Sequence, residues 1–215
     1  GLASFIGKRL REKLILVDIV CHGVPAPYIW RDYLTYLEKK YKQPIVEVNF
    51  RDKSRVGWNE HIESFVFQDG SKKEFNTYTY LFYRHIMLRP SCSKCHYTNF
   101  KRPSDFTLAD YWGWEKLSPY FNKDNKGCSL LLVNTEKGRH FLKYISIDLN
   151  LIVSNKILCL QPNLQIPSKP SDKSSLFEYL YIKHGFKKVA QKFSDLNYKS
   201  NIKKIIRKIL KAIRK

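Results

Sequence analysis

A strand–turn–helix sequence near the start of the chain most constrains the fold. Residues 14–21, LILVDIVC, form a β-branched apolar run with the length of a buried strand. Residues 22–27, HGVPAP, predict a turn, because glycine and two prolines end a strand. Apolar residues then recur at helical spacing in residues 26–41. Strand, turn and helix together form half of an α/β unit.

The rest of the chain continues this mixture of strands and helices. Residues 44–53 and 63–78 alternate apolar and polar side chains, and Asp69-Gly70 in the second stretch predicts a hairpin turn. We therefore expect an α/β (mixed α+β) fold, in which a mixed sheet is flanked by helices. The other expected elements are a short basic helix at 2–11, a helix at 78–88, strands at 106–114 and 127–135, and a helix at 139–145.

The composition predicts three parts. Residues 1–160 are expected to form the main domain. Residues 161–200 begin with a stretch rich in proline, serine and lysine, and are expected to be a linker and a helical extension of that domain. Residues 201–215 contain seven Lys or Arg, no acid and a stripe of isoleucines, which predicts a basic amphipathic helix.

The charge favours anionic partners. A formal net charge of +20 on 215 residues suits nucleic acid, an anionic membrane surface or phosphate-bearing cofactors. The basic helix suits binding to a membrane surface or to an acidic partner protein. It could also bind RNA. The alternative without a binding function is that the helix packs its isoleucine stripe on the domain. No pattern of aromatic residues predicts a stacking platform, so specific nucleic-acid recognition is disfavoured.

The cysteines point to metal chemistry in a reducing compartment. Five unevenly spaced cysteines do not suit a secreted disulfide framework, so we expect a cytoplasmic protein, peripheral to the membrane if the basic helix binds there. Cys92 and Cys95 are spaced to bend around one metal centre, as in zinc sites, iron–sulfur clusters and redox dithiols. A zinc site would want a second ligand pair nearby, and a redox dithiol would want a helix N-terminus after a strand. An iron–sulfur cluster fits best. Cys21 is the natural third ligand, although a core cysteine is an equal reading, whereas Cys128 and Cys159 are expected to pack in the core.

Five blocks of sequence carry a family resemblance. They are LVDIVCHGVPAPYIWRDYL, RDKSRVGWNEHIESFVF, RPSCSKCHYTNFKRPSDFTLADYWGW, NKGCSLLLVNTEKGRHFL and QPNLQIP. From residue 1 to about 190 the chain is similar to the C-terminal domain of the coenzyme F420 hydrogenase/dehydrogenase β-subunit family. The resemblance implies an iron–sulfur flavoprotein oxidoreductase that passes electrons between a 4Fe-4S cluster, FAD and a hydride-carrying substrate such as a deazaflavin coenzyme.

The resemblance also assigns residues. It implies that Cys21, Cys92 and Cys95 are three ligands of a 4Fe-4S cluster. The family's further cysteine would fall before Gly1, so we expect this chain to be part of a longer protein and to be inactive alone, with cluster and FAD dependent on the missing sequence. An electron-transfer partner protein or subunit is expected.

Two further groups of residues are candidates for cofactor binding. Aromatic rings can cover a flavin and glycine allows close backbone approach, while a cation, a glycine and a hydroxyl can contact a phosphate. For the group at 110–113 the alternative is a core strand followed by a turn, and for the group at 126–129 it is a simple loop. The candidates are Asp110, Trp112, Gly113, Lys126, Gly127 and Ser129.

Catalytic residues are not identified, and two other function classes remain open. One is a zinc-stabilised basic module that binds nucleic acid. The other is a non-catalytic interaction or membrane-associated member of the family, with a link to surface-polysaccharide synthesis.

Overall fold

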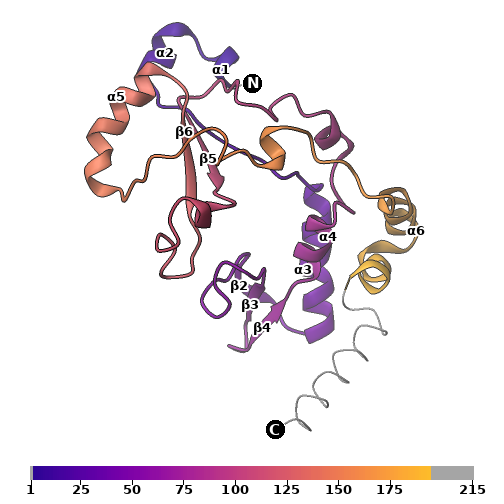
Figure 1. The fold of residues 1–215 in the computed structure, drawn as a ribbon. Coiled ribbons are helices and arrows are strands. Elements are labelled where there is room, and N and C mark those ends of the chain that lie inside the picture. The colour runs from indigo at the N-terminus through magenta and orange to yellow at the C-terminus, as the bar shows by residue number, and fades with distance from the viewer. Residues whose placement is uncertain (1, 195–215) are drawn as a thin grey trace. The chain divides into compact units, whose positions relative to one another are not determined.

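The computed structural model describes residues 2–194, which form two compact units, each built from two segments of the chain. The first unit contains residues 2–22 and 94–168, and the second contains residues 23–93 and 169–194 (Figure 1). The predicted mixed α/β class is confirmed, but the strands form two small sheets where one was expected. The predicted basic helix at 201–215 lies outside the described residues.

The first unit contains a mixed three-stranded sheet in the order β1-β5-β6. Strand β1 (Val17–Ile19) runs parallel to β5 (Phe106–Asp110), and β5 runs antiparallel to β6 (Ser129–Val133). The helices of this unit are α1 (Leu2–Phe5), α2 (Lys8–Lys13), η2 (Trp114–Lys116), α5 (Glu136–Ile145), η3 (Ser146–Asp148) and η4 (Pro162–Leu164).

Two predictions for the N-terminal segment need correction. The single helix expected at 2–11 is two short helices. The buried strand expected at 14–21 is reduced to β1, whose Val17 and Ile19 side chains are 54% and 62% exposed. The reason is that Val17 and Ile19 point to the face of the sheet outside the core, whereas Val20 on the alternate face packs against the core, so this apolar run is covered on one face only.

The second unit packs helices against an antiparallel sheet in the order β2-β3-β4. The predicted hairpin is confirmed, because β3 and β4 are joined through Asp69 and Gly70, with Gly70 at φ 78°. The predicted helix at 78–88 ends early, and His85 beyond it has a left-handed φ of 55°. The elements are α3 (Pro27–Tyr41), β2 (Ile45–Asn49), β3 (Glu63–Phe67), β4 (Lys72–Phe75), α4 (Thr77–Tyr83) and α6 (Ser174–Phe193); the 3₁₀ helix η1 (Pro90–Lys94) spans the division between the units.

The two units have cores of different size. Among the described residues, the core of the second unit contains thirteen buried side chains, many of them aromatic and most of them drawn from α3, β3, α4 and α6. The core of the first unit contains five, around Tyr111, Leu130 and Leu164. Along β5 and β6 the residues that enter this core alternate with residues on the opposite face of the sheet. The opposite face of the sheet therefore lies outside this core and is available to line a cavity. Within residues 2–194 no helix has the length and apolar character to cross a bilayer.

Candidate functional site

The five thiols divide into two classes by exposure. All five are unbridged; Cys21 is exposed and Cys92 and Cys95 are half-buried, whereas Cys128 and Cys159 are buried. The expectation that Cys128 and Cys159 pack in the core is confirmed, since both belong to the core of the first unit. Burial raises the pKa of both thiols, with the nearby carboxylates of Glu115 and Asp124 adding to the effect at Cys128. These two cysteines are poor metal ligands in this state, because ligation requires the thiolate.

Cys92 accepts a hydrogen bond from a backbone loop. The Val24 N–H donates to Cys92 Sγ at 3.2 Å, and N–H···S bonds of this kind stabilise negative charge on sulfur. The loop is fixed by a bridge between Pro25 and Leu88. Gly23 has a φ of 154°, a backbone conformation that residues with a side chain rarely adopt, and a Cβ there would also lie 2.7 Å from the Leu88 side chain.

An arginine side chain ties together the chain segments that carry Cys21 and Cys95. Arg102, with its side chain 3% exposed, donates to the Asp18 carboxylate at 3.0 Å and to the Ile19 carbonyl at 2.7 Å. It also donates to the Tyr97 carbonyl. Asp18 and Ile19 lie within three residues of Cys21, and Tyr97 lies two residues after Cys95. One guanidinium thus holds both segments within the first unit.

The three predicted ligands do not form a preassembled metal group. In residues 2–194 no three His, Cys, Asp or Glu side chains are placed to hold a metal ion together. Cys21 and Cys95 belong to the first unit and Cys92 to the second, so the division between the units passes inside the CxxC pair. The donor chemistry fits an iron–sulfur cluster, since the three thiols are unbridged and not buried and one already accepts an N–H bond. The ligand set remains a prediction.

The two groups of predicted cofactor residues meet at one end of the first sheet. The register of β5 and β6 places Asp110 directly opposite Ser129. Beyond Asp110 the chain exposes Trp112, half of whose surface is accessible, and turns at Gly113 with a left-handed φ of 88°. Strand pairing therefore joins residues that are nineteen positions apart in sequence.

A tight loop carries the other candidates. Gly127, at φ 91°, donates its N–H to Asn122 Oδ1 at 2.7 Å, which closes the loop before β6. Lys126 is exposed and lies 3.8 Å from Asp124. Lys126 and Gly127 are thus on this turn, and Ser129 is the first residue of β6.

This end of the sheet opens into a pocket of about 890 Å³, which we call the sheet pocket. Gly127 and Ser129 line it. Asp110 lies on the same face of β5 as the lining residues Phe106 and Leu108, because these positions are two residues apart. Trp112, Gly113 and Lys126 are not in the lining. The sheet pocket is lined by Ile15, Val17, Phe106, Leu108, Tyr120, Phe121, Lys123, Asp124, Gly127, Cys128, Ser129, Leu131, Phe141, Ile145, Leu149, Asn150 and Leu151.

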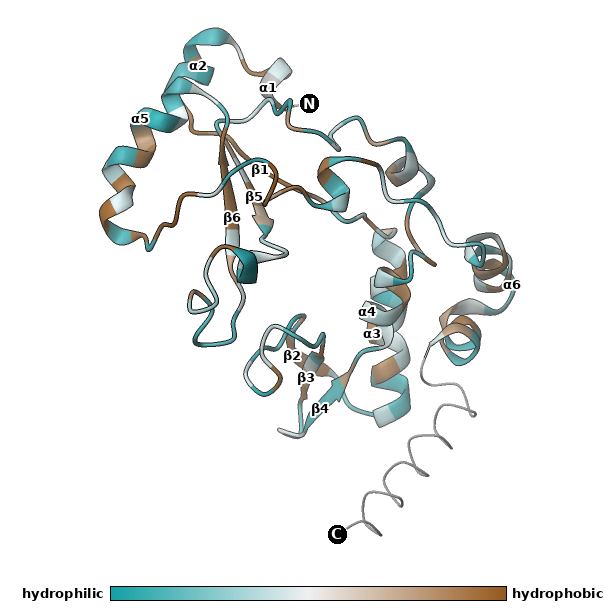
Figure 2. Cartoon of the chain, viewed as in Figure 1, coloured by the Kyte–Doolittle hydropathy of each residue, from teal (hydrophilic) through white to brown (hydrophobic). Residues whose placement is uncertain are grey.

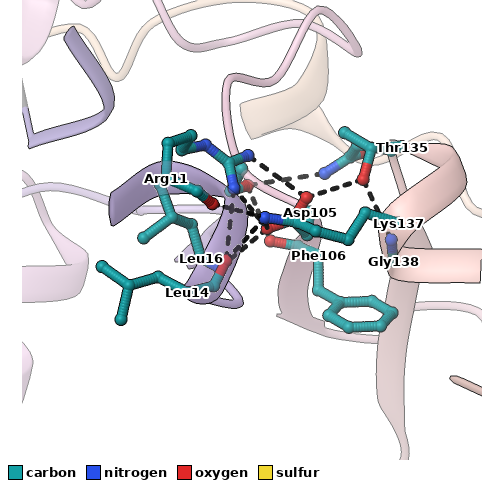
Figure 3. Close-up of polar contacts among 10 residues, drawn as sticks. Arg11, Leu14, Leu16, Asp105, Phe106, Thr135, Lys137 and Gly138 are labelled. Atoms are coloured by element: carbon teal, nitrogen blue, oxygen red, sulfur yellow. Dashed lines mark hydrogen bonds and ion pairs between the residues drawn. The ribbon is translucent and has the colours of Figure 1, made fainter. Parts of the chain in front are cut away.

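A buried carboxylate, Asp105, connects elements that contribute residues to the sheet pocket, and Figure 3 shows its polar contacts. The Asp105 side chain is 1% exposed and accepts two hydrogen bonds from Arg11, at 2.8 and 3.1 Å, with the Lys137 ammonium 3.4 Å away. It also accepts from the Leu16 N–H at 2.9 Å and from the Thr135 hydroxyl at 2.7 Å. The network therefore connects α2, the start of β1, the start of β5 and the first turn of α5.

The electrostatics of this carboxylate follow from its partners. Removal from water acts to raise the pKa of Asp105, but the bonds from Arg11, Leu16 and Thr135 outweigh it and hold that pKa well below its ordinary range. Thr135 also caps α5, because its hydroxyl accepts the Gly138 N–H at 3.0 Å. Asp105 is thus a charged structural residue within the first unit.

Sequence reasoning missed both Arg102 and Asp105. Each is a charged residue in the stretch KRPSDF, where neither periodicity nor a motif distinguishes a structural ion pair from a solvated loop. The apolar residues of the sheet pocket carried a weak signal, since Phe141 and Ile145 are four residues apart on one face of α5.

Comparison with known proteins identifies one family. Residues 3–156, more than half of the chain, match the family described as the C terminus of the coenzyme F420 hydrogenase/dehydrogenase beta subunit. The match spans Cys21, Cys92 and Cys95 and every residue that lines the sheet pocket. No curated protein and no solved structure matches the sequence significantly.

Proposed function

The chain belongs to the coenzyme F420 hydrogenase/dehydrogenase β-subunit family, and from this premise we propose that it is the cluster- and flavin-binding C-terminal portion of an oxidoreductase. The family is consistent with electron transfer. Our proposal is finer: Cys21, Cys92 and Cys95 ligate a 4Fe-4S cluster, and a flavin binds beside the end of the first sheet. When bound, a cluster carries single electrons and a flavin exchanges two, so the pair couples one-electron partners to a hydride carrier.

The observation that supports the cluster proposal is that the three candidate thiols are unbridged and not buried. Arg102 fixes the segments before Cys21 and after Cys95 within one unit. The Val24 N–H supplies Cys92 with the hydrogen bond that protein scaffolds provide to cluster sulfurs. The other two thiols are buried and protonated, which leaves three candidates among the five.

The flavin proposal uses the surface where the two predicted groups meet. Asp110 and Ser129, paired across the strands, offer a carboxylate and a hydroxyl on one face of the sheet. Trp112 offers an exposed aromatic face, and Lys126 and Gly127 offer a cation and a turn at its edge. The sheet pocket continues this surface with apolar walls. A protein partner that exchanges electrons with the chain is part of the same proposal.

Anaerobic reconstitution tests the cluster ligands. The chain is incubated with ferrous iron and sulfide, desalted, and measured for iron, sulfide and absorption. We expect iron and sulfide to be bound in about equal amounts with a broad brown absorption, and the cluster to be held weakly because this chain supplies only three of the proposed ligands. Cys21→Ser, Cys92→Ser and Cys95→Ser should each lower the bound iron at least severalfold.

Cys159→Ser is the matched control, because it removes a thiol that is buried and outside the proposed ligand set. It should retain the iron of the parent chain. Equal iron in Cys21→Ser and the parent would contradict the ligand set. One equivalent of zinc bound in preference to iron, with no chromophore, would support the zinc-stabilised alternative in place of the cluster.

A further inference from the structure

Helix α6 packs one face in the core of the second unit and exposes the other. Phe177 and Phe186 are buried in that core, whereas Leu176, Tyr179 and Ile182 are 42%, 56% and 78% exposed. The three exposed residues follow one another at intervals of three, so they lie on one side of the helix, and we call them the apolar stripe. In Figure 2 α6 carries both hydrophobic and hydrophilic residues. Clustered apolar residues on a helix that is already packed indicate a second contact surface.

Beyond a break in the helix the exposed face is basic. Gly185, with φ 72° and ψ −178°, interrupts the helical backbone, and Val189 and Ala190 after it are buried. This half has four exposed residues, which we call the basic face: Lys187, Lys188, Gln191 and Lys192. Among the described residues none of its lysines forms an ion pair. Glu178, in the first half, is the single acid of α6.

Lys183 combines the two kinds of surface. Its ammonium donates to the Tyr179 hydroxyl at 3.2 Å and lies 5.6 Å from the centre of the Tyr179 ring. Lys183 is itself exposed, so its charge stays at the surface beside the apolar stripe. Long cationic side chains that keep their stems on apolar surface and their charge in water are favoured at membrane interfaces.

The charge that follows α6 favours an anionic surface as the partner. Residues 195–215 continue the chain from the end of the helix with eight Lys or Arg and one acid, Asp195. Each cation near an anionic bilayer adds to the attraction, and exposed aliphatic side chains gain free energy when lipid removes them from water. Nucleic acid would attract the lysines through its phosphates but would not favour exposed Leu176 and Ile182.

We propose that the exposed face of α6 docks the protein on an anionic lipid bilayer. The apolar stripe enters the interfacial region and the basic face lies at the lipid headgroups, as in amphipathic helices that lie in the plane of a bilayer surface. The proposal is independent of the proposed cluster and flavin. It is therefore tested on the full chain free of iron and flavin.

Vesicle flotation tests the basic face. Vesicles of phosphatidylcholine with an equal part of phosphatidylserine should carry the protein, and vesicles of phosphatidylcholine alone should carry much less. Lys187→Gln combined with Lys188→Gln should weaken binding to the anionic vesicles about tenfold. Lys39→Gln combined with Lys40→Gln is the matched control, because it removes two adjacent exposed lysines of α3. It should weaken binding by less than about threefold.

The apolar stripe is tested with Ile182→Gln, which should weaken vesicle binding about threefold to tenfold. Ile147→Gln is its matched control, because Ile147 is 88% exposed in the first unit, and it should change binding by less than about twofold. Near-ultraviolet circular dichroism confirms that each variant keeps its fold. Vesicle binding that falls with the α6 lysines but not with Ile182→Gln would indicate nucleic acid or an acidic protein as the partner and would overturn the proposal. Equal losses in the α6 variants and their controls would overturn it as well.

Discussion

Each unit contains a buried carboxylate, and the two are stabilised in opposite ways. Asp105 in the first unit is paired with the cations of Arg11 and Lys137, and its pKa is held low. Glu63 in the second unit accepts hydrogen bonds from neutral groups: the Tyr33 hydroxyl at 2.8 Å, and the N–H and hydroxyl of Thr79 at 2.5 Å. Burial raises the pKa of Glu63, and these neutral donors only partly oppose it.

The difference reflects how each unit is held together. The second unit has a core of thirteen buried residues and uses Glu63 within it, where the carboxyl group caps the N-terminal turn of α4 through Thr79. The first unit has a core of five and relies on ionic contacts among its elements. Its uncovered sheet face is what remains available for a ligand. A small core is thus linked to the presence of the sheet pocket.

The largest effect is expected from removing the charge of Asp105. Asp105→Ala deprives Arg11 and Lys137 of their shared partner and leaves the Leu16 N–H without its acceptor. Loss of one member of a buried ion pair costs about 3–5 kcal/mol, and we expect the lower end because both cations are partly exposed. Urea unfolding measures the change, and hydrogen exchange should show lost protection in α5 and not in α3.

The control for this substitution is Asp124→Asn, which removes an ion pair between exposed side chains and should change the free energy of unfolding by less than about 0.5 kcal/mol. Equal effects of the two substitutions would show that the Asp105 network does not organise the first unit. The wild-type contribution of Asp105 is present above its ordinary pKa of 3.8 and is lost as the pH falls below that value, because its pKa in the folded state is lower.

Neither of these carboxylates could be predicted from the sequence to be buried. Glu63 stands at the start of a clear strand pattern, where a solvated end is the ordinary expectation, and its donors come from α3 and α4. Local patterns did predict α3, the β3–β4 hairpin, β5, β6 and α5, because helical or strand periodicity and turn residues mark each of them in the sequence. The prediction of a buried strand at 14–21 was wrong because apolar content does not show whether one face of a strand or both faces are covered.

Gly138→Ala should cause the second largest loss in the free energy of unfolding. In the first turn of α5, a Cβ at this position would lie 2.7 Å from the Asp105 carbonyl oxygen, a backbone atom that cannot move alone. Alanine favours a helix, but the clash should dominate and destabilise the first unit by about 1–3 kcal/mol. Thermal and urea unfolding measure the change. Gly7→Ala, where a Cβ meets nothing within 4 Å, is the control, and an equal response would contradict the close packing of α5 on Asp105.

The candidate site was predictable in part. Residue type and spacing singled out Cys92 and Cys95, and strand alternation was enough to expect Ser129 and Leu131 on one face. The pairing of Asp110 with Ser129 depends on the register between two strands, and the clamp by Arg102 depends on a long-range contact. Both are set by tertiary packing, which short-range patterns do not encode.

Of the three substitutions, Glu63→Gln should change the free energy of unfolding least, and it should raise it, whereas the other two lower it. The amide keeps an acceptor for Thr79 and offers a donor to the Tyr33 hydroxyl, and it removes the cost of a buried charge. We expect the free energy of unfolding to rise at neutral pH, by less than Gly138→Ala lowers it, because burial raises the pKa of Glu63 and its charged form therefore costs the folded state more than the unfolded state.

The pH dependence of this variant sets the two units apart. Below the ordinary pKa of 4.5, Glu63 is protonated in the folded and unfolded states, so the wild type and Glu63→Gln should be equally stable with respect to this group. As the pH rises above 4.5 the unfolded state ionises first, and the wild type loses stability relative to the variant up to the raised pKa of the folded state. Glu47→Gln on the exposed β2 is the control for loss of a carboxylate, and should change the free energy of unfolding by less than about 0.5 kcal/mol. Parallel stability curves for the wild type and Glu63→Gln from about pH 4 to 8 would mean that Glu63 ionises freely, and the contrast with Asp105 would then be lost.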